Sequence, residues 1–104
     1  MTREHVVVLK RRIGQTQLMR EKAFAKIQEG RTSHSKIDKN SVDQNGKLYH
    51  INNEELNAVG RILINLLHEV ERNDTDDFDR MNLWINTQCQ SLETRINNVY
   101  AIYR

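Results

Sequence analysis

The sequence contains no proline, a single cysteine and only four glycines among its 104 residues. Proline ends or kinks helices, so its absence leaves room for long uninterrupted helices. One cysteine, Cys89, excludes an intramolecular disulfide framework and any all-cysteine metal site. The chain has no apolar run of the roughly eighteen residues that a membrane helix needs, and its first residues lack the apolar stretch of a secretory signal. We therefore expect a helical, cytoplasmic protein without membrane contact.

Charge is distributed unevenly along the chain. Residues 1–47 carry eleven Lys and Arg against five Asp and Glu, a net charge of +6. Residues 48–104 carry five against nine, a net charge of −4. Oppositely charged segments attract once folding or assembly brings them within a Debye length of about 8–10 Å. The pattern fits contacts between these segments, within one chain or between copies, and also a basic surface for an anionic partner.

Residues 3–29 have the spacing of one long helix, with a stripe that advances in alternating steps of three and four. The stripe consists of Val6, Leu9, Ile13, Thr16, Arg20, Ala23 and Ile27. Arg20 stands near its centre, where a charge is costly unless it is paired or reaches solvent. At about 1.5 Å per residue this helix is about 40 Å long, which is more than a lone small globule needs. Its length predicts a long partner helix.

Residues 41–51 contain an Asn45-Gly46 pair between two short β-favouring stretches. This dipeptide accepts the positive φ angles of a type I′ turn, so we predict a small β-hairpin over residues 41–51. The segment also resembles the calcium-binding loop of EF-hand proteins at Asp43, Asn45, Gly46 and Leu48. Calcium needs carboxylates at the first and last positions of that loop, where Ser41 and Asn52 stand. We therefore expect no metal here.

Two further helices follow. Asn52 with Glu55 forms a capping-box pattern that predicts a helix over residues 52–72, whose stripe is Leu56, Val59, Leu63, Leu66 and Val70. Four aspartates between positions 74 and 79 favour a helix start there, which predicts a helix over residues 74–103. Its stripe is Phe78, Met81, Ile85, Leu92, Ile96, Val99 and Tyr103, bordered by Trp84 and Cys89. The expected fold is all-α: one helical domain over residues 1–104, with long, short and long helices at 3–29, 52–72 and 74–103.

Extended apolar stripes and oppositely charged segments are typical of proteins that assemble with other molecules. We therefore expect a non-enzymatic protein–protein interaction module, such as a small adaptor, regulator or assembly subunit. We also expect it to form a homo-oligomer through the first and third helices in a coiled-coil manner. The residues expected to bind the partner are Val6, Leu9, Ile13, Arg20, Phe24, Tyr100 and Tyr103.

Two alternative functions remain open. The first is a nucleic-acid-binding accessory subunit that uses the basic residues Lys10, Arg11, Arg12, Lys22, Lys26 and Arg31. The second rests on Arg61 and His68, whose Arg-x6-His spacing resembles the active-site signature of the HEPN superfamily of helical ribonucleases. The resemblance implies that Arg61 stabilises phosphate charge and that His68 assists attack by a 2′-hydroxyl, although Ile62 replaces the usual polar residue after the arginine. With no other chemical motif present, we expect no enzymatic activity, no cofactor and no metal site.

Overall fold

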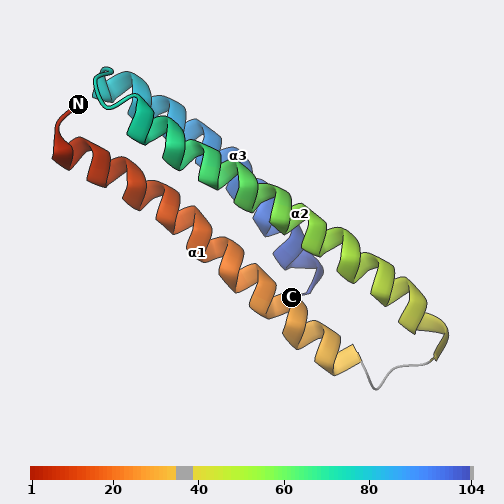
Figure 1. The fold of residues 1–104 in the computed structure, drawn as a ribbon. Coiled ribbons are helices and arrows are strands. Elements are labelled where there is room, and N and C mark those ends of the chain that lie inside the picture. The colour runs from red at the N-terminus through yellow and green to blue at the C-terminus, as the bar shows by residue number, and fades with distance from the viewer. Residues whose placement is uncertain (35–38, 104) are drawn as a thin grey trace.

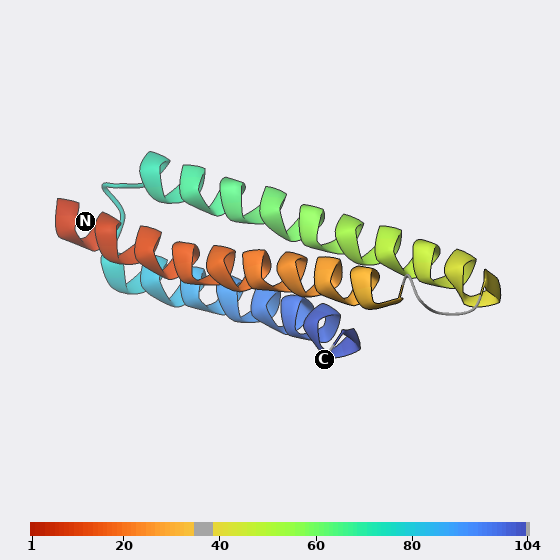
Figure 2. The same ribbon diagram turned by 90° about the horizontal axis from the view of Figure 1, so that it is seen from below.

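The computed structural model describes residues 1–34 and 39–103, and the side chains of residues 1–29 and 47–103. Its elements are three helices: α1 (Arg3–His34), α2 (Lys39–Arg72) and α3 (Phe78–Ile102). They lie side by side in a slender bundle of 57 × 16 × 16 Å (Figure 1). α1 and α3 run in the same direction, and α2 runs antiparallel to both (Figures 1 and 2).

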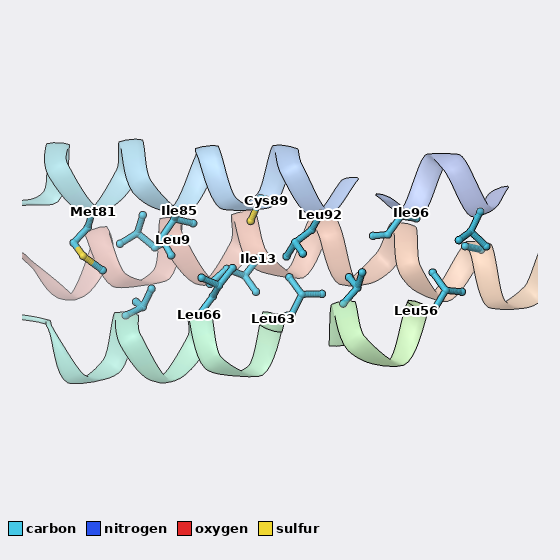
Figure 3. Close-up of a cluster of buried hydrophobic side chains, with 14 of the residues drawn as sticks. Leu9, Ile13, Leu56, Leu63, Leu66, Met81, Ile85, Cys89, Leu92 and Ile96 are labelled. Carbon is cyan, nitrogen blue, oxygen red and sulfur yellow. The ribbon is translucent and has the colours of Figure 1, made fainter. Parts of the chain in front are cut away.

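The core is a line of mostly aliphatic side chains that point into the space between the three helices (Figure 3). The stripes expected from the sequence supply it. The buried residues are Leu9, Ile13, Thr16, Ala23 and Ile27 from α1, Leu56, Val59, Leu63, Leu66 and Val70 from α2, and Met81, Ile85, Cys89, Leu92, Ile96 and Val99 from α3. Burying a Leu or Ile side chain stabilises a fold by about 1.5–3 kcal/mol. The three helices therefore cover their apolar edges within one chain, and their length alone does not require a second molecule.

The structure confirms the all-α three-helix bundle, and the predicted β-hairpin is wrong. Residues 41–51 belong to α2, and the described part of the chain contains no strand. The pair Asn45-Gly46 permits a tight turn without requiring one, and an isolated two-stranded hairpin is marginal in water. Extending an existing helix fixes one residue for each hydrogen bond gained, which is easier than nucleating a new element. Tyr49, three residues before Asn52, packs against the core. This contact favours the helical extension.

The order of helix lengths also differs from the expectation, because α2 is the longest helix with 34 residues and α3 the shortest with 25. Asn52 lies inside α2 and is buried, so it is not an N-cap. α3 begins at Phe78, and its N-cap is Asp77, whose carboxylate accepts a hydrogen bond from the backbone N–H of Asp79 at 3.1 Å. Of the four aspartates, Asp77 is therefore the cap and Asp79 lies in the first turn, while Asp74 and Asp76 precede the helix.

Contacts at the two ends fix how the helices are aligned. The N-terminal amine donates to the backbone oxygens of Asp74 and Asp76 at 2.8 and 3.1 Å, which ties the start of α1 to the α2–α3 connection. At the other end of α3, Asn52 Nδ2 donates to the hydroxyl of Tyr103 at 3.0 Å. α3 therefore ends level with Asn52, and α1 and α2 extend beyond it (Figure 2). Over the residues that the structure describes, none of the helices combines the length and apolarity needed to span a bilayer.

Candidate docking groove between α1 and α2

A groove with a volume of about 480 Å³ runs between α1 and α2, and none of its lining residues comes from α3. We call it the α1–α2 groove. Its lining consists of Lys10, Ile13, Gly14, Gln17 and Arg20 from α1, and Asn57, Gly60, Arg61, Leu63, Ile64 and Leu67 from α2. Four of these side chains are aliphatic: Ile13 and Leu63 are buried, Leu67 is partly buried, and Ile64 is 53% exposed. The groove thus presents apolar surface to solvent mainly at Ile64.

Two glycines on opposite helices shape the groove. A Cβ atom added at Gly14 would meet nothing within 4 Å, so this stretch of α1 is open. A Cβ atom added at Gly60 would lie 2.6 Å from Cζ and Nη2 of Arg20, so the missing side chain provides the space for this guanidinium. Glycine inside a helix lowers its stability by about 1 kcal/mol relative to alanine. At Gly60 the missing side chain is what makes room for Arg20.

Arg20 is the charged residue in the apolar stripe of α1. Its head group reaches the groove, where Nε donates to the backbone oxygen of Leu56 at 2.6 Å and Nη1 donates to Gln17 Oε1 at 3.2 Å. Its Cζ atom lies 4.9 Å from the centre of the Phe24 ring, within cation–π range. Burial lowers the pKa of the guanidinium, and the charge of Glu21 partly opposes this effect. No carboxylate of the described residues forms an ion pair with Arg20.

The charges along the groove are all positive. Lys10 stands at one end, where its Nζ pairs with Glu71 Oε1 at 3.0 Å. Arg61 is exposed at the rim and forms no ion pair with any described carboxylate. The lining itself contains three cations, including Arg20, and no Asp or Glu. The groove therefore presents an apolar floor beside uncompensated positive charge.

Most residues expected to bind a partner serve the bundle itself. Leu9 and Ile13 are buried in the core, and four others are partly buried against it: Val6, Phe24, Tyr100 and Tyr103. Of the seven, only Ile13 and Arg20 line the α1–α2 groove. Most of the apolar seam of α1 is therefore occupied by the bundle itself.

The basic residues of α1 do not form one cationic surface. Three of them are engaged within the chain: Lys10 with Glu71, Arg12 with Glu93, and Lys26 with Glu29 at 3.7 Å. Lys26 Nζ also lies 5.9 Å from the centre of the Tyr100 ring. Arg11 and Lys22 are exposed, and the side chain of Arg31 lies outside the described residues. This arrangement leaves few of the basic side chains free to contact a phosphate backbone.

Arg12 instead joins a polar network between α1 and α3. Its Nη1 and Nη2 donate to the two carboxylate oxygens of Glu93 at 2.6 and 3.0 Å, and its Nε donates to Asn86 Oδ1 at 2.9 Å. The buried Thr16 hydroxyl donates to Glu93 Oε2 at 2.8 Å. The hydrogen bonds from Arg12, helped by Thr16, hold the pKa of Glu93 below its usual range. Burial raises the pKa of the neighbouring Cys89 thiol, although Thr16 and Arg12 act in the opposite direction.

The two residues of the ribonuclease-like spacing lie about two turns apart on the same helix. Both are exposed on α2, but Arg61 lines the groove and His68 does not. Seven residues of helix place them about 10 Å apart along the helix axis. Among the described residues there is also no group of three or more His, Cys, Asp or Glu side chains placed to hold a metal ion.

Comparisons with protein-family models, with curated proteins and with solved structures find no match to this chain. Function is therefore inferred from the chemistry of the α1–α2 groove. Sequence reasoning missed this groove because residues from the stripes, such as Ile13 and Leu63, combine there with residues that flank them on two separate helices. Two features of the sequence could have indicated the groove. Gly14 and Gly60 are glycines inside strong helical patterns, and Arg20 is a charged residue within an apolar stripe.

Proposed function

We propose that the chain is a non-enzymatic protein-interaction module, a small adaptor, regulator or assembly subunit, that binds a segment of another protein in the α1–α2 groove. The observation that carries this proposal is the apolar lining of the groove, in which Ile64 is 53% exposed and Leu67 is partly buried.

The shape of the groove suits a helical segment. Lys10 and Arg20 mark its extent along α1, and ten residues of helix span about 15 Å, or about three turns. An amphipathic helix binds such a groove through apolar side chains that recur every three or four residues. Gly14 removes a side chain from the α1 wall and has no neighbour within 4 Å of its Cβ position, so the backbone of an incoming helix can approach closely there.

The groove favours a different protein over a second copy of the same surface. Two identical grooves placed face to face would bring Arg20 and Arg61 of both copies together, and like charges repel across an interface. The self-association expected through the first and third helices would therefore need another surface, such as the exposed side of α3, where Leu83 is 71% exposed. It remains a prediction that a mass measurement of the purified protein tests.

Site-specific photo-crosslinking in the native host tests the proposal. A benzophenone side chain placed at Ile64, inside the groove, should give a defined adduct with a second protein. The same group at Asn65, which is exposed beside the groove, serves as the matched control. The adduct at position 64 should disappear in Gly14→Leu, because that side chain projects into open space and fills the groove. Gln15→Leu adds the same apolar side chain outside the groove and should leave the adduct unchanged.

Adducts of equal yield at positions 64 and 65, or adducts that persist in Gly14→Leu, would overturn the proposal. An adduct with twice the mass of the chain would identify a second copy as the occupant, which would contradict binding of a different protein in this groove. A defined adduct of another mass that is specific to position 64 and sensitive to Gly14→Leu supports the proposal.

A further inference from the structure

Arg20 has hydrogen-bonding capacity that the described chain does not use. A guanidinium carries five N–H donors, and Arg20 has protein acceptors for one N–H of Nε and one of Nη1. Its Nη2 lies over Gly60 in the groove and has no acceptor among the described residues. Three donors of a partly buried cation are therefore available to a molecule that enters the groove.

The available donors belong to a cation that forms no direct ion pair with a described carboxylate, although the charge of Glu21 acts on it. Arg20 and Arg61 line the same groove, and neither is paired with a described carboxylate. The planar fork of a guanidinium matches the two oxygens of a carboxylate, and such charge-assisted pairs are stronger than neutral hydrogen bonds. Partial burial of Arg20 reduces screening by water and strengthens this attraction. The arginines of the site thus favour an oxyanion, and a carboxylate is the oxyanion that a protein segment carries.

We infer that the occupant of the α1–α2 groove is an acidic amphipathic helix, and that Arg20, assisted by Arg61, anchors one of its carboxylates; this inference rests on the proposed function. The apolar side chains of the helix lie on Ile64 and Leu67, and Gly14 admits its backbone. A nucleic acid fits the site poorly, because the lining contains no aromatic side chain for base stacking and its floor is aliphatic.

Synthetic helical peptides of about eighteen residues, long enough to cover about three turns of groove, provide the probe. One peptide carries leucine at helical spacing with glutamate at the polar positions, and a second replaces every glutamate with lysine. A third keeps the composition of the first but disperses its leucines. Fluorescence anisotropy measures binding of each peptide to the full chain. Only the first peptide should bind tightly, and it should shift the amide resonances of Gly14 and Gly60, which line the groove.

Variants of the full chain test the anchor. Arg20→Gln should weaken binding of the glutamate peptide by about tenfold or more, the effect expected for loss of a charge-assisted hydrogen bond. Arg61→Gln should also weaken binding, because it removes a positive charge from the groove. It should not affect the fold, because the Arg61 side chain is exposed. Lys22→Gln removes an exposed positive charge that does not line the groove, and this matched control should bind like the wild type.

Equal binding of the glutamate and lysine peptides would overturn the acidic-helix assignment, as would unchanged affinity in both Arg20→Gln and Arg61→Gln. Either result would leave a groove-specific adduct at position 64, and with it the proposed function, intact. Loss of that adduct would instead refute the proposed function, whatever the peptides show. Tight binding of the dispersed-leucine peptide would show a non-specific attraction between charges and would also overturn the assignment.

Discussion

The Arg12–Glu93 pair offers a quantitative test of how α1 and α3 are joined. Glu93→Gln keeps the size of the side chain but removes its charge, and it retains one oxygen for Arg12 in place of two. The two side chains are only 19% and 20% exposed, so solvent screens this pair less than a surface ion pair. A hydrogen bond to a charged group contributes about 1.5–3 kcal/mol, against about 1 kcal/mol for a neutral one. We expect the variant to lower the free energy of unfolding by about 2 kcal/mol.

Urea denaturation followed by far-ultraviolet circular dichroism measures this change. For a chain of this size, a loss of about 2 kcal/mol corresponds to a melting temperature lower by roughly 8–16 °C. The double variant with Arg12→Gln should lose less than the sum of the two single variants, because both remove the same interaction. Glu29→Gln is the matched control: this glutamate also pairs with a basic residue, Lys26, but its side chain is 69% exposed. Its removal should change stability little.

The same pair predicts how stability depends on pH. Its hydrogen bonds with Arg12 lower the pKa of Glu93 in the folded state. The stabilisation is therefore fully present above the ordinary glutamate pKa of about 4.3 and is lost as the pH falls through the lower folded value. The difference between the wild type and Glu93→Gln should shrink as the pH falls below about 4. A difference that stays constant from neutral to acidic pH would show that the charge of Glu93 is not responsible, and the reasoning would fail.

Other consequences of the structure can be tested together. Gly14→Ala should stabilise the fold by about 0.5–1 kcal/mol in thermal melts, because alanine favours helix and its Cβ meets no neighbour. Gly60→Ala should not give this gain, since its Cβ displaces Arg20, and the Nε–H resonance of Arg20 should move; an unmoved resonance would contradict the packing described. Cys89 is fully buried, so a thiol reagent should modify it at least about tenfold more slowly in the native protein than in urea; equal rates would refute its burial. Purified protein and His68→Ala should both leave RNA intact, and cleavage that depends on His68 would establish the ribonuclease alternative.

Sequence alone predicted the interior of each helix well. Leu9, Ile13, Leu63 and Ile85 are buried where the three-and-four spacing places them, because a helix can hide only one face. The absence of proline also leaves room for the long helices, and the lack of a second cysteine excludes an internal disulfide. These features depend on periodicity and covalent chemistry, which are properties of the chain itself.

Tertiary structure decided where the helices end and which charges meet. Residues 41–51 could form a turn or a helix at similar local cost, and packing of Tyr49 on the core favours the helix. The sequence suggested Arg12 as one of the basic residues that could bind nucleic acid. In the structure it pairs with Glu93, which is 81 positions later in the chain. The α1–α2 groove likewise exists only once packing brings Gly14 and Arg20 of α1 and Gly60 of α2 to one lining. Local patterns specify which face of a helix is buried, whereas partners that are distant in sequence are fixed only by how whole helices pack.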